Sequence, residues 1–136
     1  IDMLQALNTG HDGSLSTGHA NSPKDMISRL ETMVLMGMDL PLPAIERQIA
    51  SGLDIIVHLG RLRDKSRKVL EVTEVLGYWD GQIHLQTIYR YEEIRKEDEN
   101  VTENEKKDQE NKVHGEWKKV AELFHREKLV AAGYYI

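Results

Sequence analysis

Apolar residues in the first half of the chain recur at helical spacing. Ser22-Pro23 predicts the beginning of one helix, because serine accepts bonds from free backbone N–H groups and proline suits the first helical position. This helix is expected to end near Gly37, and two further helices are expected over residues 2–7 and 44–52. The apolar stripe of the helix that begins at Pro23 consists of Met26, Ile27, Leu30, Met33 and Val34.

The second half of the chain changes to the period of strands. Residues 54–59 are apolar at nearly every position, which predicts a strand buried on both faces. Asp80-Gly81 predicts a hairpin turn, because both residues tolerate positive φ. Four strands are expected: a short one at 14–17, one at 54–59 that continues through 61–64, one at 67–76 and one at 82–91. Turns are expected at 64–66 and 79–81. The last strand alternates, so one face is assigned to Ile83, Leu85, Thr87, Tyr89 and Tyr91.

Charge is concentrated toward the C-terminus. Residues 92–112 hold 9 acidic and 5 basic residues, a balance of −4 in a chain whose net charge is −5. Because such a composition buries little apolar surface, a solvated loop or disordered insert is expected there. Residues 116–132 return to helical spacing and predict a last amphipathic helix, with Gly133 suited to cap its end. Its apolar face would consist of Trp117, Val120, Ala121 and Phe124.

The composition is that of one ordinary domain. The 136 residues are 40% hydrophobic and 30% charged, which is enough for a single core. No apolar run approaches the roughly 18 residues of a membrane span, and no signal peptide is visible. No basic face is evident, so nucleic acid is not expected among the partners. The chain has no cysteine, which excludes a disulfide framework and a thiolate metal site.

Two Thr-Gly-His triplets, Thr9–His11 and Thr17–His19, carry the most specific chemistry. His19 would project from the end of a short strand, just before a helix N-terminus. An imidazole and free backbone N–H groups together suit a phosphate, so one interpretation is an anion site. A hydrogen-bonded structural histidine is a second interpretation. A metal site formed by His11, Asp12 and His19 is a third, although its spacing matches no standard zinc pattern.

The residues around the triplets carry a longer resemblance. Residues 4–23, with Leu7-Asn-Thr-Gly-His-Asp-Gly-Ser-Leu-Ser-Thr-Gly-His-Ala-Asn-Ser-Pro23, resemble the His box of the CpaF branch of the bacterial secretion ATPases. These are the ring motors of type II and type IV secretion and of tight-adherence (Flp) pilus assembly. The likeness continues through 28–36, 44–51, Arg61-Leu-Arg-Asp64 and Val72-Thr-Glu-Val75, and so covers residues 1 to about 91. Residues 127–133 resemble the tail of the family more loosely.

The resemblance implies an α/β fold for residues 1–136: the C-terminal portion of a RecA-like P-loop NTPase domain. Two helices would be followed by antiparallel strands and a C-terminal helix. His19 would be catalytic and reach toward the γ-phosphate of ATP, while Arg61 and Arg63 would face a neighbouring subunit or the nucleotide. The residues that the resemblance implies for nucleotide binding are His11, Thr17, Gly18 and His19.

The resemblance also implies a longer parent protein that binds ATP and Mg²⁺. That parent would form a hexameric ring on the cytoplasmic face of the inner membrane, beside inner-membrane platform proteins. The phosphate-binding loop of the family, Gly-x4-Gly-Lys-Ser/Thr, precedes the His box, and the 136 residues contain no such motif. We therefore expect a fragment of an ATP-hydrolysing motor for pilus assembly or protein secretion, inactive alone and associating as a dimer or higher oligomer. The alternative is a non-catalytic scaffold or regulatory module of the same machinery.

Overall fold

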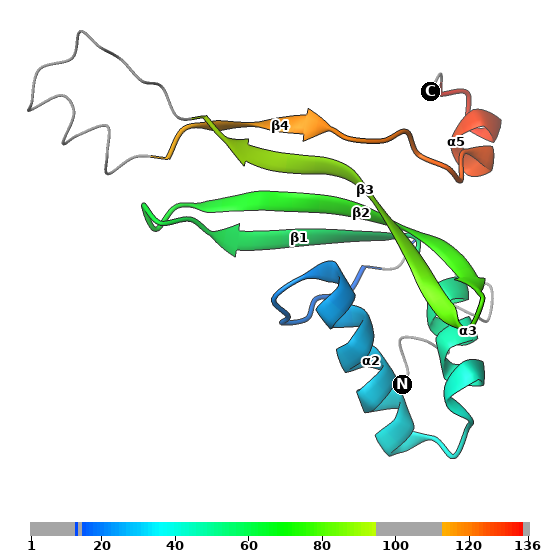
Figure 1. The fold of residues 1–136 in the computed structure, drawn as a ribbon. Helices are drawn as coiled ribbons and strands as arrows, with labels where there is room; N and C mark the ends of the chain where they lie inside the picture. The colour runs from blue at the N-terminus through cyan, green and yellow to red at the C-terminus, as the bar shows by residue number, and fades with distance from the viewer. Residues whose placement is uncertain (1–12, 14, 95–112, 135–136) are drawn as a thin grey trace, which may run out of the picture.

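The computed structural model describes residues 13, 15–94 and 113–134 of the chain. Two helices lie against one side of an antiparallel sheet, and a short helix lies beyond its last strand (Figure 1). The described elements are α2 (Pro23–Gly37), α3 (Leu42–Gly52), β1 (Ile55–Arg61), β2 (Arg67–Trp79), β3 (Gln82–Glu93), β4 (Gly115–Lys119) and α5 (Glu127–Ala131). The expectation of a mixed α/β chain with two helices before antiparallel strands is confirmed, while the expected helix at 2–7 lies outside the described residues.

Helix α2 begins where the sequence predicts. The Ser22 hydroxyl accepts a hydrogen bond from the Asp25 backbone N–H at 3.0 Å, and Pro23 occupies the first turn. The Asp25 carboxylate accepts in return from the Asn21 backbone N–H at 3.1 Å. This reciprocal cap fixes the entry to the helix. Helix α3 begins at Leu42, two residues before the predicted position, because Pro43 fits the first helical turn as well as it fits a kinked connection.

The four strands follow one another in the sheet in the order β1-β2-β3-β4, all antiparallel. Tight turns explain the order of the first three strands. Asp80 and Gly81 both have positive φ, 53° and 75°, as the predicted hairpin between β2 and β3 requires. Lys65 has φ 66° in the turn between β1 and β2, which is also where the sequence predicts one. Strand β2 runs three residues past its predicted end, up to the hairpin at Asp80.

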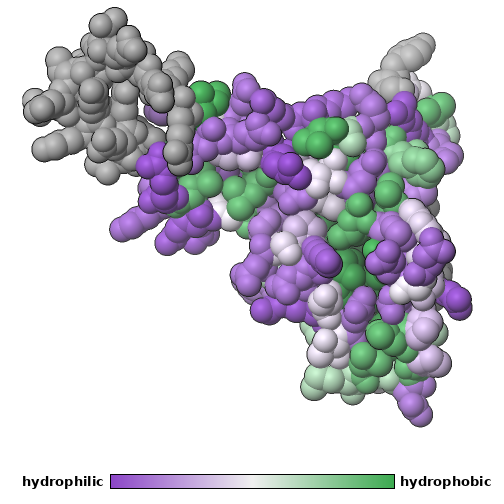
Figure 2. Space-filling model, in the orientation of Figure 1, coloured by the Kyte–Doolittle hydropathy of each residue, from purple (hydrophilic) through white to green (hydrophobic). Residues whose placement is uncertain are grey.

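The core lies between the two helices and the sheet. Ile45 and Ile49 of α3 are fully buried, and Ile27 and Val34 of α2 complete a single cluster with them. The sheet contributes the partly buried side chains of Ile56, Ile83 and Leu85. The predicted stripe of α2 is therefore confirmed at its centre, although Met33 remains 61% exposed. Figure 2 shows many hydrophobic residues over the helical part of the molecule. Hydrophilic residues predominate at the end of the sheet where the β1–β2 hairpin lies.

The prediction that residues 54–59 form a strand buried on both faces is wrong. Strand β1 is the first strand of the sheet, and its exposed and half-buried residues alternate. Ile56 points toward the helices, whereas Ile55, Val57 and Leu59 are 42%, 52% and 65% exposed on the other side. We call that side the open face of the sheet. An antiparallel sheet covered on one side needs only one apolar face, so the second apolar row of β1 remains uncovered within the described chain.

The predicted shared face of β3 is interrupted. Val72 pairs with Tyr89 but its neighbour Thr73 pairs with Thr87, so Ile88 is the extra residue of a bulge. Because paired residues of an antiparallel sheet lie on one face, Thr87 lies on the helix side and Tyr89 on the open face. Ile88 itself is buried, 5% exposed. The alternation of the sequence is regular across this point, and nothing in it indicates the bulge.

The predicted helix over residues 116–132 is also wrong. Residues 115–119 form β4, which pairs with the end of β3, and residues 120–126 follow without regular structure. Only residues 127–131 are helical. Gly133, at φ 91°, does cap this short helix: its N–H bonds the Val130 carbonyl and the Tyr134 N–H bonds the Leu129 carbonyl, both at 3.0 Å.

Strand β4 forms because the edge of β3 offers it partners. Trp117 pairs with Tyr91, and its indole N–H reaches across β3 to donate to the Val69 carbonyl at 2.6 Å. Glu92 and Lys118 form an ion pair at 2.9 Å, which raises the pKa of Lys118. Glu92 and Glu93 thus belong to β3 rather than to the charged insert predicted over 92–112. The rest of that insert, from residue 95, lies outside the described residues.

Candidate functional site

The segment before α2 does not form the predicted strand. Residues 15–20 have no regular structure, and residues 15–19 are exposed, with the Leu15 side chain fully so. A strand needs a neighbouring strand for its backbone hydrogen bonds. Within the described residues the sheet begins at β1, and no strand pairs with this segment. Thr17, Gly18 and His19 therefore form an exposed loop that leads into the cap of α2.

At Gly18 the loop passes close to the side chain of Met26. A Cβ built there would lie 2.6 Å from the Cε of Met26, one turn into α2. The loop thus passes close to the helix side, which favours glycine at this point. His19 follows directly and is exposed, so its imidazole is accessible to a ligand. His11, the second histidine predicted to bind nucleotide, lies outside the described residues, so its position relative to His19 stays a prediction.

The N-terminus of α2 is less open to an anion than the sequence suggests. Pro23 has no N–H, and the Asp25 N–H is taken by the Ser22 hydroxyl. The Asp25 carboxylate also places negative charge at this end of the helix, where it binds the Asn21 N–H. At least one of the N–H groups expected to be free beside His19 is therefore bound within the chain. The residues that fit a phosphate here are His19 and Thr17, as polar side chains of an exposed loop, and they do not form a complete phosphate cradle.

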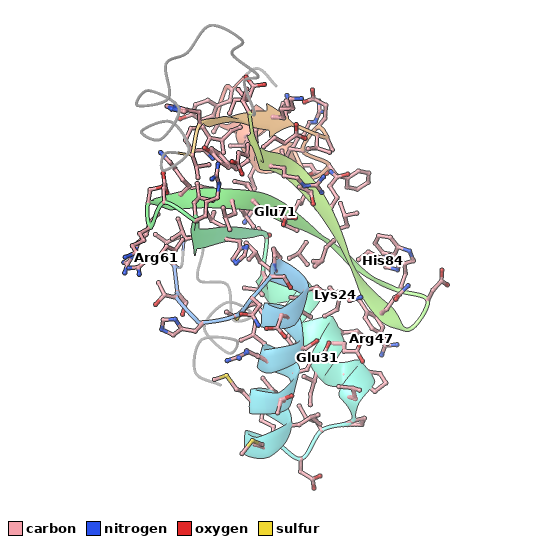
Figure 3. The ribbon with its side chains drawn as sticks, turned by 60° about the vertical axis from the view of Figure 1, so that its left-hand side comes forward. Lys24, Glu31, Arg47, Arg61, Glu71 and His84 are labelled. Atoms are coloured by element: carbon pink, nitrogen blue, oxygen red, sulfur yellow. The ribbon has the colours of Figure 1, made fainter. Side chains whose placement is uncertain are left out.

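The two arginines predicted to face a neighbouring subunit have different surroundings. Arg63 donates from Nε to a carboxylate oxygen of Glu93 at 3.1 Å, so its guanidinium is engaged within the chain. Arg61 ends β1 directly opposite Arg67 of β2, and both are exposed. Figure 3 shows Arg61 at the outer end of the β1–β2 hairpin, away from the helices. Two like charges directly opposite one another are unfavourable, which makes this end of the hairpin receptive to an anionic group.

Asp64, in the turn beside these arginines, connects the hairpin to the beginning of the last strand. Its carboxylate accepts from the backbone N–H of Ser66 and from that of Val113, both at 2.9 Å, and from the Ser66 hydroxyl. These hydrogen bonds favour the charged form and lower the pKa of Asp64 to about 2. Together with the Arg63–Glu93 pair, Asp64 thus brings Glu93 and Val113 to the same turn.

We expect Asp64→Asn to be less stable than the parent chain at pH 6 and to approach it at low pH. The folded-state pKa lies below the ordinary 3.8, so the contribution of the charged carboxylate is present above pH 4 and is lost between about pH 4 and pH 2. Urea unfolding at several pH values measures the difference, with Asp39→Asn on the exposed α2–α3 connection as the control. A stability difference that stays constant from pH 6 to pH 2 would contradict the assigned bonds.

The structure gives the metal interpretation no support. The described residues contain no group of three or more His, Asp or Glu side chains placed to hold a metal ion, and His11 and Asp12 lie outside them. A shallow hollow on α2 is lined by Ser28, Arg29, Thr32 and Met33, none of which was predicted as a site residue.

The sequence did not indicate the role of Glu74. This residue of β2 is 1% exposed, and its carboxylate accepts from the backbone N–H groups of Phe124 and His125 at 2.7 and 2.9 Å. It also accepts from the Gln86 side chain at 3.2 Å. The available signal was a carboxylate between the aliphatic residues Val72 and Val75 of a predicted strand. A buried carboxylate requires donors, and here the irregular segment after β4 supplies them.

Comparison with known proteins places these features in a family. Residues 1–123 match the family described as Type II/IV secretion system protein. A protein of Mycobacterium tuberculosis (strain ATCC 25618 / H37Rv), named as a conjugal transfer protein, is 34% identical over 89 residues, 65% of this chain. The conjugal transfer protein TrbB of Rhizobium radiobacter is 33% identical over 87 residues, 64% of this chain.

The matched region spans about a quarter of the length of these curated relatives, 25% in each case. Among the helices in the described part of the chain, none has the length and apolar character needed to span a membrane. The family match includes the Thr17–His19 loop, helices α2 and α3 and all four described strands, and it ends before α5.

Proposed function

Because the chain belongs to the Type II/IV secretion system protein family, we propose that it forms the C-terminal part of an ATP-hydrolysing motor domain. The observation that carries the proposal is the family match over residues 1–123. The resemblance of residues 4–23 to the CpaF branch favours a motor for pilus assembly or protein secretion. The names of the similar proteins make conjugal transfer a further candidate for the process that the motor serves.

His19 is the proposed catalytic residue of this part of the motor. It lies exposed in a loop that Gly18 keeps close to α2, so a phosphate can approach the imidazole without displacing packed side chains. An imidazole beside the γ-phosphate supplies a hydrogen bond or a positive charge, the kind of stabilisation that phosphoryl transfer needs. Thr17 in the same loop, and His11, are proposed to support nucleotide binding.

The part of the nucleotide site that encloses the phosphates is proposed to belong to other parts of a longer protein. No Gly-x4-Gly-Lys-Ser/Thr motif occurs in the 136 residues. The described side chains beside His19 can contact a phosphate, but they do not surround it. When bound with ATP, Mg²⁺ neutralises charge on the phosphate oxygens. The contribution of this chain is then to orient His19 and Thr17 from the capped start of α2.

The assembled motor is proposed to be a hexameric ring at the cytoplasmic face of the inner membrane, beside platform proteins of the machine. Arg61 is the better candidate for contact with a neighbouring subunit, because Arg63 already binds Glu93. Arg61 is exposed and lies opposite Arg67, so an anionic group of a neighbour would relieve the repulsion between them. A scaffold or regulatory module remains the second candidate function, favoured by the incomplete phosphate site.

Adding MgATP to the isotopically labelled chain separates these two functions. We expect weak binding, in the millimolar range of a single phosphate contact, with NMR shifts centred on Thr17, Gly18 and His19. His19→Ala should abolish these shifts, whereas His58→Ala on β1 should leave them unchanged. We expect ATP hydrolysis by the chain alone to stay at background. Turnover above background would contradict the proposed division of the site, and shifts centred elsewhere would favour the scaffold.

A further inference from the structure

Met26 differs from its neighbours on α2 in what it packs against. Ile27 and Val34 are buried between the helices and the sheet, and Leu30 packs against them. Met26 is half-buried, yet it is not among the described side chains that form or contact that core. Its thioether lies against Gly18, where a Cβ would be 2.6 Å from Cε and 3.2 Å from Sδ. The loop before α2 therefore covers Met26.

The same loop is attached to α2 a second time, after His19. The Asn21 backbone N–H donates to the Asp25 carboxylate at 3.1 Å. Arg29, one turn further along α2, lies with Nε 3.7 Å from that carboxylate. Only His19 and Ala20 lie between the two attachment points, and three Cα–Cα steps of about 3.8 Å each leave such a span little freedom to move away from the helix. Ala20 is half-buried and His19 exposed, so the span presents the histidine outward.

We propose that Met26 is a positioning residue for His19, because it fixes the backbone just before the histidine. The inference rests on the catalytic role proposed for His19. A hydrogen-bond donor accelerates phosphoryl transfer when it is already placed at the developing charge, and a displacement of about 1 Å can lower the rate about 10²-fold. Methionine suits this task, because its long unbranched side chain fills irregular gaps. Gly18 has no Cβ, so the thioether reaches the backbone of the loop.

This role can be separated from a general contribution to stability. Shortening Met26 removes a contact with the loop and leaves the core cluster and the Ser22 cap in place. The loop then stays attached through Asp25 alone. We therefore expect the backbone around Gly18 to become more mobile while the fold is retained. Met33→Ala is the matched control, because it removes the same atoms two turns further along α2, at a side chain that is 61% exposed.

NMR relaxation on the full chain tests the anchoring without nucleotide. We expect backbone order parameters at Gly18 and His19 to fall from about 0.85 to below about 0.6 in Met26→Ala. Met33→Ala should leave them unchanged, and Met26→Leu, with a side chain of similar volume, should preserve most of the order. Circular dichroism verifies that each variant is folded. Order parameters that do not fall in Met26→Ala would overturn the anchoring, whatever His19 does.

Steady-state turnover tests the positioning in a protein that carries this chain together with a phosphate-binding loop. We expect Met26→Ala to lower kcat about 10-fold with KM changed less than twofold, a smaller loss than for a full 1 Å displacement because Asp25 still holds the loop. Met26→Leu should recover most of the rate, and Met33→Ala should retain it. Adding Met26→Ala to His19→Ala should cause no further loss, because Met26 acts through His19.

The same measurements distinguish failure of the positioning role from failure of the proposed function. Normal turnover of Met26→Ala beside slow turnover of His19→Ala would overturn the positioning role and leave the proposed function standing. Normal turnover of His19→Ala would overturn both, while the order parameters would still decide whether Met26 anchors the loop. A further loss in the double variant would show that Met26 acts on turnover by a route other than His19, which also contradicts the proposal.

Discussion

Replacing His19 by alanine is expected to lower ATP turnover about 100-fold in a protein that carries this chain together with a phosphate-binding loop. This is the usual effect of removing one preorganised donor from a transition state, about 10²–10³-fold. His19 is exposed and precedes the self-capped start of α2, so its removal leaves the cap and the core unchanged. The loss should therefore appear in turnover rather than in folding.

Steady-state kinetics on the purified motor would measure this effect. A residue that stabilises transferring charge lowers kcat with little change in KM, whereas a residue that only binds ATP raises KM. His58→Ala, at a half-buried histidine of β1, is the control and should retain normal turnover. His19→Asn is expected to recover part of the rate, because its amide still donates a hydrogen bond. Turnover of His19→Ala within twofold of the parent protein would remove His19 from the catalytic site.

The sequence predictions are accurate where residues close in sequence determine an element, and they fail where a distant strand determines it. The start of α2 follows from Ser22 and Asp25, and the hairpin follows from Asp80 and Gly81, all within a few residues in sequence. The predicted C-terminal helix was wrong because residues 115–119 pair with β3, which lies far away in sequence. Trp117 pairs with Tyr91 and bonds the Val69 carbonyl, contacts that spacing alone does not indicate. Tertiary pairing here overrides a helical pattern.

The structure agrees with only part of the geometry that the sequence predicts for the candidate site. Sequence reasoning selected Thr17, Gly18 and His19, and the structure places them in one accessible loop beside α2. It also predicted a strand before them, which was wrong, and free N–H groups after them, of which the Asp25 N–H is bound within the chain. The strand has no partner among the described residues, and the N–H of Asp25 is bound by Ser22. The second point was predictable, because a residue that caps a helix also occupies one of its donors.

Glu74→Ala is expected to destabilise the chain by about 2–4 kcal/mol. The Glu74 carboxylate binds two backbone N–H groups of the segment after β4 and the side-chain amide of Gln86. Each buried donor left without a partner costs about 1–3 kcal/mol, and the segment can recover part of that cost by moving into water. Glu74→Gln should cost less, about 1–2 kcal/mol, because one amide oxygen still accepts while the NH₂ group faces a backbone donor.

Glu71→Ala provides the control for Glu74→Ala, because Glu71 lies three residues earlier in β2 and on the helix side of the sheet. Glu71 accepts from the hydroxyls of Thr73 and Thr87, which can rotate toward other acceptors, so its loss should cost less. Hydrogen exchange adds the decisive readout, because only the Glu74 variants should lose protection at the amides of Phe124 and His125. Unchanged exchange at these two amides, or a loss of stability no larger than that of Glu71→Ala, would show that the last segment is held by other contacts.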